Sequence, residues 1–576
     1  MDILTYLQSP QSYLWAALLG VVLHLTLFRY GEWDWSAPAL ISSFFTTQLI
    51  LLGFLTAYAP SWKAILLAVL HVSALGTCLL AGTSASILIY RGFFHRLSRF
   101  PGPFWARLSA MYPTSLSVRS KLHLYEEVQA LHRQYGDFVR LGPMELSIAD
   151  PRAVQAVNSA QTPCTKGPWY NGMRPRVALQ NSRDKQEHSQ RRKVWDRGFG
   201  AKSLRDYEPR VVSYTTGLMN AIEAQKGKPL NVTDWFNFYS FDVMGDLAFG
   251  KSFDMVKNGV KHYFMNSLKT NMTMAGYFKH IVWIAPIFRS TPILNFEHKR
   301  FWKFVNSQVD ERMKMKPDKP DVFSYLLEEY EKQEPKTAQG LMNLQADAYL
   351  IVVAGSDTTA ATLTSLFFHL ATEPHLLTEL RKHVDPLFEA GEVDSVALSK
   401  SKHLDAVINE ALRLHPPVPS GVQRLTPPEG MIIGETFVPG NTIVYVPFYT
   451  LFRGKHSHPD AQSPNTGLQR NSLQCLYLDE RNFRRPEEFI PERWTTNPEL
   501  TVDASVFVPF SYGPYSCIGK QLALMELRYV TAYIVHQYDF TLAQGEDPAK
   551  FTRDMTDGFT LACPPLSLVF TERKTA

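Results

Sequence analysis

The chain of 576 residues is 45% hydrophobic, 12% aromatic and 20% charged, which excludes a disordered chain, a collagen and a small disulfide-rich scaffold. Its 59 basic and 54 acidic residues give a net charge of only +5, without the basic bias of nucleic-acid-binding proteins, so no nucleic-acid partner is expected. The five cysteines are odd in number and widely scattered, which favours a reducing compartment over a disulfide framework.

Three apolar runs with almost no charge occupy the first hundred residues, at 15–28, 39–58 and 64–90. The second and third are long enough to cross a bilayer, and the first reaches the required ~20 residues with its flanks. A signal peptide does not fit, because Asp2 and no basic residue precedes the first run. We therefore predict a membrane anchor at 1–99 with up to three transmembrane helices. A single span, a re-entrant pair and a buried helical hairpin remain as alternatives.

Basic residues follow the third run. Arg91, Arg96 and Arg99 place the next domain on the cytosolic side by the positive-inside rule, so three spans leave the amino terminus in the lumen. The Pro-Gly-Pro sequence at 101–103 cannot continue a helix. The boundary between anchor and globular domain is therefore expected there, with the globular domain at 100–576.

Helical patterns dominate the globular domain, and strands are few. Residues 137–148 predict two short strands around a Gly-Pro turn, and 431–434 with 442–446 predict two more around a turn at 438–441. A long apolar helix is expected over about 345–372, and another from Gln521. The predicted fold class is mainly α with small β-sheets.

Residues 510–519 read Phe-Ser-Tyr-Gly-Pro-Tyr-Ser-Cys-Ile-Gly and precede the last of these helices. Cys517 therefore lies at a loop-to-helix junction, where helix amides favour an anion and lower the pKa of a thiol. Gly513 and Gly519 allow the backbone to approach a flat ligand closely. A thiolate in this position is either a nucleophile or a metal ligand, and the pattern alone does not decide between them.

Residues 354–359, Ala-Gly-Ser-Asp-Thr-Thr, interrupt the long apolar helix. Glycine inside a helix costs about 1 kcal/mol relative to alanine, so Gly355 indicates room for a small ligand beside the helix. Asp357 and Thr358 supply an acid and an alcohol in apolar surroundings, which suits a proton relay. A Ser/Thr-rich packing face is the alternative.

A glutamate and two arginines form the last motif. Glu410 and Arg413 are three residues apart and share a helix face, and Arg493 lies in the sequence Pro-Glu-Arg-Trp at 491–494. An ion pair of this kind on the protein surface would contribute little to the free energy of unfolding. We expect instead a buried carboxylate between two guanidiniums, which is tolerable only as a satisfied network.

In this order, the four motifs resemble those of a fungal membrane-bound cytochrome P450 of the microsomal, secondary-metabolism kind, from about Phe100 to the carboxyl end. The resemblance implies the cytochrome P450 fold behind the membrane anchor, with haem b as cofactor. Cys517 would be the axial ligand of the haem iron, where a thiolate favours O–O cleavage. Phe510, Gly513 and Gly519 would belong to the same haem-binding loop.

The other motifs acquire roles from the same resemblance. Gly355 to Thr358 would line the oxygen pocket, with Asp357 and Thr358 delivering protons. The remaining three residues, Glu410, Arg413 and Arg493, would form a structural triad near the haem. The haem propionates would be bound by His188, Arg192 and Arg424, since cationic donors suit carboxylates. Substrate contacts are expected from 163–182, 263–288, Val352, Val353, 418–422 and 558–560, which are mostly apolar.

Two features depart from the family pattern. Tyr515 stands where the family usually has an arginine that contacts a propionate, and a phenol provides one neutral hydrogen bond instead of a cation. Residues 454–478 form a polar insert without helix or strand periodicity, where the family has almost none. We interpret the insert either as a retained intron or as a true surface loop.

The sequence thus predicts a haem-thiolate monooxygenase that inserts one atom of O2 into a lipophilic small molecule, in fungal secondary metabolism. No flavin or nicotinamide domain is recognisable, so the expected electron donor is NADPH–cytochrome P450 reductase, docking near Lys520, with cytochrome b5 as an additional donor. The expected location is the endoplasmic reticulum membrane, with lipid around the anchor and the catalytic domain in the cytosol. A haem-thiolate isomerase or dehydratase that uses no O2 and a degenerate, haem-free membrane protein are the alternatives.

Overall fold

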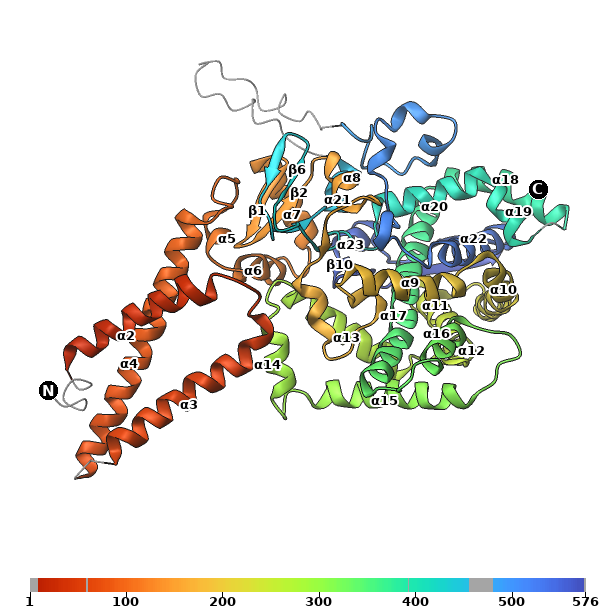
Figure 1. The fold of residues 1–576 in the computed structure, drawn as a ribbon. Coiled ribbons are helices and arrows are strands. Elements are labelled where there is room, and N and C mark those ends of the chain that lie inside the picture. The colour runs from red at the N-terminus through yellow and green to blue at the C-terminus, as the bar shows by residue number, and fades with distance from the viewer. Residues whose placement is uncertain (1–8, 58–60, 392, 455–479, 574–576) are drawn as a thin grey trace, which may run out of the picture. The chain divides into compact units, whose positions relative to one another are not determined.

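The computed structural model describes residues 9–57, 61–391, 393–454 and 480–573 (Figure 1). The chain divides into two compact units, both mainly helical, as the sequence predicted. The first unit consists of Met1–Thr114, Arg140–Met144 and Phe278–Arg300, and the second of Ser115–Val139, Glu145–Tyr277 and Phe301–Ala576. All of the predicted insert except Gly454 lies outside the described residues.

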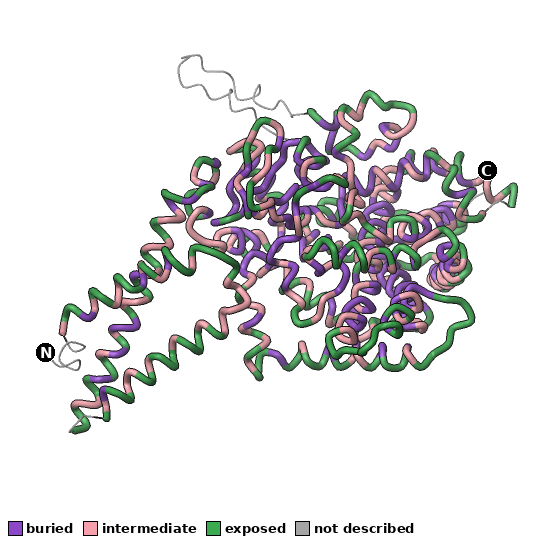
Figure 2. The backbone as a smooth tube through the Cα atoms, in the orientation of Figure 1, coloured by how far each residue is buried: buried purple, intermediate pink, exposed green. Residues whose placement is uncertain are grey.

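Helices occupy all three apolar runs of the first unit. By length and composition, Pro10–Phe28, Asp34–Thr56 and Trp62–Phe94 can each cross a membrane. Their surfaces are largely exposed, as Figure 2 shows, which is expected of helices that face lipid. The elements of this unit are α2 (Pro10–Leu23), η1 (His24–Phe28), η2 (Asp34–Ser36), α3 (Ala37–Thr56), α4 (Trp62–Ile89), η3 (Tyr90–Phe94), α5 (Phe104–Leu108) and α14 (Ile284–Ser290); α6 (Met111–Arg119) continues into the second unit.

Helices α2 and α4 pack with their backbones almost in contact. A Cβ atom on Gly82 would overlap the carbonyl oxygen of Ala17, so only glycine permits this approach. A hydrogen bond of 2.7 Å between Nδ1 of His24 and Oγ of Ser86 joins the same helices. Small residues and interhelical hydrogen bonds of this kind are typical of helix pairs in membranes.

The second unit contains most of the helices. They are α7 (Leu124–Tyr135), α8 (Arg152–Asn158), η4 (Pro168–Met173), η5 (Leu179–Asn181), α9 (Lys185–Gly198), α10 (Ala201–Ala224), α11 (Val232–Phe249), α12 (Met255–Asn258), α13 (Tyr263–Phe278, whose last residue belongs to the first unit), α15 (Phe296–Lys314, mostly in the second), α16 (Val322–Glu331), α17 (Ala338–Thr372), α18 (Pro374–Glu389), α19 (Ser395–Lys400), α20 (Lys402–Leu414), α21 (Phe448–Arg453), η7 (Pro491–Trp494), η8 (Pro498–Leu500), η9 (Ala504–Val506), η10 (Gly513–Tyr515), α22 (Lys520–Gln537) and α23 (Pro548–Arg553).

The strands form small sheets. They are β1 (Phe138–Gly142), β2 (Glu145–Ile148), β3 (Thr165–Lys166), β4 (Pro229–Asn231), β5 (Arg424–Leu425), β6 (Met431–Ile433), β7 (Thr436–Val438), β8 (Ile443–Tyr445), β9 (Tyr538–Leu542), β10 (Thr556–Asp557), β11 (Leu561–Ala562) and β12 (Ser567–Glu572). The sheet orders are β1-β2-β8-β5-β3, β4-β12-β9, β6-β7 and β10-β11.

One strand prediction is wrong. The turn expected at 438–441 does not join two paired strands, because β6 pairs with β7 around Gly434 instead. The second predicted strand, at 442–446, corresponds to β8, which runs parallel to β2 in the five-stranded sheet. Gly434 has a φ of +60°, which suits the tight turn between β6 and β7.

The core of the second unit is built around α17 and α11. Helix α17 begins at Ala338, seven residues before the predicted start, because the side chain of Thr337 caps it by accepting from the Gly340 amide at 3.0 Å. It is apolar and long enough to cross a membrane, but 72% of its apolar window is buried inside the protein. It packs along α11, most of whose residues are also buried. We therefore treat α17 as a core helix that carries the predicted acid and alcohol.

Candidate active site

A closed loop presents Cys517 ahead of α22. The backbone N–H of Cys517 donates to the carbonyl oxygen of Phe510 at 2.8 Å, which closes the loop. Gly513 has a φ of +73°, and a Cβ atom there would overlap the carbonyl oxygen of Asn158. Gly513 is thus required by the turn and its neighbouring backbone. At Gly519 a Cβ atom would make only an ordinary contact of 3.9 Å with the Phe199 ring.

The net pKa of the Cys517 thiol lies above that of an ordinary cysteine, although the helix amides act on it in the direction that the sequence predicted. Burial raises the pKa, whereas the backbone amides of Gly519 and Lys520 and the charge of Arg192 lower it. Burial outweighs them. The amides nevertheless supply the donors that a thiolate needs, and metal binding deprotonates such a thiol.

Four basic side chains gather beside this loop, and three of them are buried. Arg192, on α9, donates to the carbonyl oxygen of Ser516 at 2.7 Å. His188, one turn earlier on α9, packs edge-on against the Tyr515 ring at 4.9 Å. Arg424, on β5, places its guanidinium 4.9 Å from the centre of the same ring. The structure therefore brings together the three residues that the sequence suggested for propionate binding.

The fourth basic residue, Lys166, was not identified from the sequence. It lies on β3 directly opposite Arg424 on β5, and its Nζ is 4.9 Å from the centre of the Tyr515 ring. Like charges opposite each other destabilise a strand pair. Burial lowers the pKa of Lys166 well below its ordinary value, and the positive charge of Arg424 lowers it further. Burial and these cations, Lys166 first, lower the pKa of His188 to about 3. The sequence around Lys166 carries no motif, so only the strand pairing in the structure identifies this residue as a member of the cluster.

This cluster is suited to a dianionic ligand. The hydroxyl of Tyr515 and Nε of Arg424 are buried without hydrogen-bond partners among the described residues. Concentrated positive charge with unused donors is costly unless an anion compensates it. Tyr515 thus contributes an unused O–H donor among basic side chains.

The acid and alcohol of α17 lie in the core of the same unit. Burial raises the pKa of Asp357 to about 6, and the charge of Lys269 opposes this rise. The hydroxyl of Thr358 donates to the carbonyl oxygen of Ala354 at 2.8 Å. A Cβ atom on Gly355 would lie 2.6 Å from Sδ of Met244, so this glycine also serves the close packing of α17 on α11.

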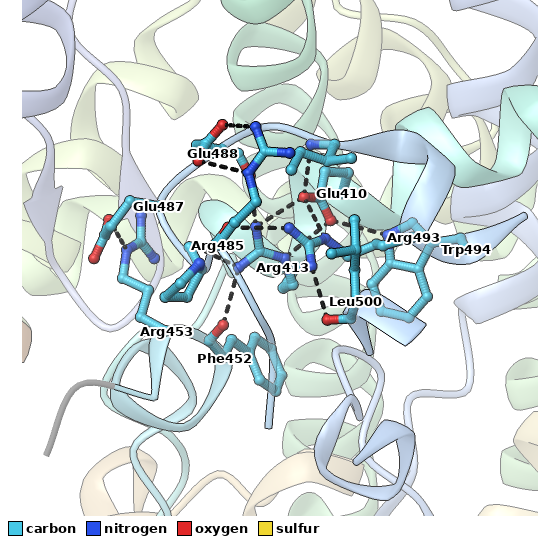
Figure 3. Close-up of polar contacts among 12 residues, drawn as sticks. Glu410, Arg413, Phe452, Arg453, Arg485, Glu487, Glu488, Arg493, Trp494 and Leu500 are labelled. Atoms are coloured by element: carbon cyan, nitrogen blue, oxygen red, sulfur yellow. Dashed lines mark hydrogen bonds and ion pairs between the residues drawn. The ribbon is translucent and has the colours of Figure 1, made fainter. Parts of the chain in front are cut away.

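Glu410, Arg413 and Arg493 form a fully buried network (Figure 3). Arg413 donates to both carboxylate oxygens of Glu410, at 2.8 and 2.9 Å, and Nε of Arg493 donates to Oε1 at 2.9 Å. Burial favours the neutral acid, but the two guanidiniums outweigh it and hold the pKa of Glu410 below its ordinary value.

The remaining donors of the network are also used. Arg413 donates to the carbonyl oxygens of Phe452, Pro486 and Glu488 at 2.6–3.0 Å. Arg493 donates to those of Arg484, Arg485 and Leu500 at 2.9–3.1 Å. The network therefore joins α20 to the irregular segment at 484–500, which precedes the Cys517 loop. Such a satisfied network has a structural role.

Comparison with known proteins agrees with this geometry. The sequence profile of the family described as Cytochrome P450 matches residues 107–463 and 471–570. The chain belongs to the cytochrome P450 family. Cytochrome P450 monooxygenase FCK2 of Fusarium pseudograminearum is 48% identical over 98% of both chains. Cytochrome P450 monooxygenase phqL of Penicillium fellutanum is 42% identical over 97% of this chain and 95% of the relative, and the tryprostatin B 6-hydroxylase of Aspergillus fumigatus is 35% identical over 97% and 96%.

Membership of this family establishes an oxidoreductase of the cytochrome P450 monooxygenase type with haem as its cofactor, as the sequence predicted. The residues present fit that group. A cysteine with two amide donors suits an iron thiolate, and the buried cations with unused donors suit two propionates. The apolar amino-terminal helices are compatible with a membrane anchor.

Proposed function

We propose that this cytochrome P450 hydroxylates a lipophilic small molecule in fungal secondary metabolism, with electrons from NADPH–cytochrome P450 reductase. The observation that carries the proposal is the adjacency of an amide-supported cysteine and a cluster of basic side chains with unused hydrogen-bond donors, both at the Cys517 loop. In the balanced reaction, R–H, O2, two electrons and two protons give R–OH and water. Bound haem supplies reductive activation of O2.

The residues of the chain have separate tasks in this proposal. Cys517 binds the iron, with its sulfur supported by the amides of Gly519 and Lys520. Lys166, His188, Arg192 and Arg424, with Tyr515, hold the propionates. Asp357 takes protons from solvent and Thr358 passes them toward O2. A pKa of about 6 suits Asp357 for this task, since a group that titrates near the working pH both accepts and releases protons readily.

The anchor and the insert belong to the same proposal. Residues 1–99 hold the enzyme in the endoplasmic reticulum membrane, and 100–576 form the cytosolic catalytic domain. Cytochrome b5 serves as an additional electron donor at the Lys520 face. The family profile is interrupted at 464–470, inside the insert, which supports the view that 454–478 is not part of the catalytic fold.

The carbon monoxide difference spectrum of the reduced full-length protein tests the haem-thiolate assignment. The strongly red-shifted Soret band of a thiolate-ligated ferrous haem is expected in the wild type and in Cys164→Ser, and is expected to vanish in Cys517→Ser. Cys164 is the matched control because it is a buried cysteine of the same unit. The same band in a protein lacking 454–478 would support the insert assignment. Absence of the band from every form would favour the degenerate protein.

Turnover distinguishes the monooxygenase from an isomerase or dehydratase. Added reductase, NADPH and an extract of candidate lipophilic metabolites should give NADPH consumption together with a product that contains oxygen from 18O2. A product formed without NADPH or O2 would support the isomerase or dehydratase instead.

A further inference from the structure

Three arginines come together at the end of the third apolar helix and the start of the globular domain. Arg91 lies in η3, Arg107 in α5 and Arg140 in β1, and all three belong to the first unit. Nη2 of Arg140 donates to the carbonyl oxygen of Arg91 at 3.3 Å, and Nη1 of Arg91 donates to that of Leu108 at 3.1 Å. Because Leu108 directly follows Arg107, these contacts place the three residues in one cluster, which we call the linker arginines.

The positive charges of the linker arginines have no carboxylate at ion-pair distance. None of the three forms an ion pair with a residue that the structure describes, and Asp34 acts on Arg91 only from farther away. Arg140 is fully buried, and its Nη1 has no hydrogen-bond partner among the described residues. Nε of Arg107 is buried without a partner in the same way. Burying a charge or a donor without a counterpart costs free energy, which a bound anion would reduce.

The titration of two groups in the cluster agrees with an excess of positive charge. Burial lowers the pKa of Arg140 to about 10, and the charges of Arg107 and Arg91 add to this effect. The group that opposes it is the phenol of Tyr90, not a carboxylate. Burial also lowers the pKa of His95 to about 3, and the charge of Arg140 is the strongest of those that lower it further. The cluster therefore favours an anion.

An exposed aromatic surface borders the linker arginines. Phe93 and Phe94 in η3 and Phe104 and Trp105 in α5 are 47–72% exposed. The rings of Phe93 and Phe104 are 6.2 Å apart, and those of Phe104 and Trp105 are 6.1 Å apart. Aromatic side chains are typical of the membrane–water interface, and the adjoining helix that can span a membrane ends at Phe94. In a membrane around this helix, the linker arginines lie at the depth of the lipid headgroups.

A phosphate at the membrane surface matches this cluster. Guanidinium groups donate paired hydrogen bonds to phosphate oxygens. Arg91 and Arg107 are only half-buried and so are accessible to a ligand, whereas the buried Arg140 contributes its charge. Basic pockets beside transmembrane helices on the cytosolic side bind the headgroups of anionic lipids. The aromatic surface beside the arginines suits acyl chains, which a free phosphate lacks.

We propose that the linker arginines bind the phosphate of an anionic phospholipid, while the acyl chains of this lipid lie against the aromatic surface. Arg91 and Arg107 contact the phosphate, and Arg140 acts on it through its charge. The inference goes beyond the proposed hydroxylation and rests only on the proposed membrane anchor. The bound lipid fastens the linker between the anchor and the globular domain to the membrane surface.

Lipid retention by the full-length holoprotein tests the proposal. The protein is titrated in neutral detergent micelles with phosphatidic acid or with phosphatidylcholine of the same acyl chains, and native mass spectrometry counts the lipids that stay bound. A neutral micelle has no charged bilayer surface, so a lipid is retained by a site and not by diffuse attraction. Arg140 also fastens the backbone at Arg91, so the variants are Arg107→Gln and the double variant Arg91→Gln with Arg107→Gln. The control is Arg99→Gln, which removes one exposed charge from the same linker.

We expect the wild type to bind phosphatidic acid about tenfold more tightly than phosphatidylcholine, as charge-assisted hydrogen bonds to one phosphate predict. Arg107→Gln should reduce this preference, the double variant should abolish it, and Arg99→Gln should keep it. An excess of inorganic phosphate should leave the lipid bound, because it lacks acyl chains.

Four outcomes would overturn the proposal: equal affinity of the wild type for both lipids, a double variant that keeps the preference, an equal loss in Arg99→Gln, or complete displacement of the lipid by inorganic phosphate, which would assign the cluster to free phosphate. Failure of the proposed function would look different. A protein that remains in solution without detergent and binds neither lipid would refute the anchor as well, and an enzyme that oxygenates nothing would leave the lipid preference unchanged.

Discussion

Replacement of Glu410 by glutamine tests the triad most directly. Glu410 accepts five hydrogen bonds, two from Arg413 and one each from Arg493, Trp494 and the amide of Ile490. Glutamine preserves the shape but removes the charge and turns one acceptor oxygen into an NH2 donor that faces these donors. Loss of one partner from a buried ion pair costs about 3–5 kcal/mol, because the remaining charges stay buried.

The assay is urea unfolding of the full-length holoprotein in detergent, followed by loss of the red-shifted carbon monoxide band. With a slope of about 3 kcal/mol per molar urea, the Glu410→Gln midpoint should fall by about 1 M or more. Because the folded-state pKa of Glu410 is lowered, its contribution is complete above its ordinary pKa and is lost as the pH falls through the folded-state pKa. The difference from wild type should therefore be full at pH 7 and shrink in acid.

The matched control is Glu488→Gln in the same segment. The side chain of Glu488 is 53% exposed and pairs with the similarly exposed Arg485, and an exposed pair contributes about 0–1 kcal/mol. Its midpoint should stay close to that of wild type. Equal midpoints for Glu410→Gln and Glu488→Gln at pH 7 would refute the view that the buried network stabilises the haem-binding fold.

Three further predictions concern other parts of the chain. The protonated fraction of Asp357 falls about tenfold per pH unit above 6, so proton delivery should fail more often and peroxide release per NADPH should rise from pH 6 to 8 in wild type. The Asp357→Asn variant should release more peroxide and lose this pH dependence. An unchanged pH profile in that variant would exclude Asp357 from the relay. The Lys166→Met variant should lose haem to apomyoglobin about tenfold faster than wild type, because the substitution removes a charged donor beside Arg424. An unchanged rate of haem loss would show that Lys166 does not bind a propionate. The Gly82→Leu variant should separate α2 from α4, because the leucine side chain would overlap Ala17. Its yield of protein extracted from membranes should fall below that of the control Gly53→Leu, where a Cβ atom meets nothing within 4 Å. Equal yields would contradict the packing of the anchor.

Features that depend on neighbouring residues were predictable from the sequence. Apolar runs identify the amino-terminal helices because a bilayer requires ~20 apolar residues in succession, and a glycine-rich loop before a helix locates Cys517. The order of four motifs was enough to recognise the family. The pairing of β6 was mispredicted, because short strands carry too little periodicity to select a partner.

Relations between distant residues were decided by the tertiary structure alone. Glu410 meets Arg493 across 83 positions, Lys166 lies opposite Arg424, and Lys269 acts on Asp357 from another helix. The sequence contains all of these groups, but their effect depends on burial and on distances set by packing. The sign of the Cys517 pKa shift shows this most clearly: the helix amides act as the local sequence predicts, and burial by the folded chain outweighs them.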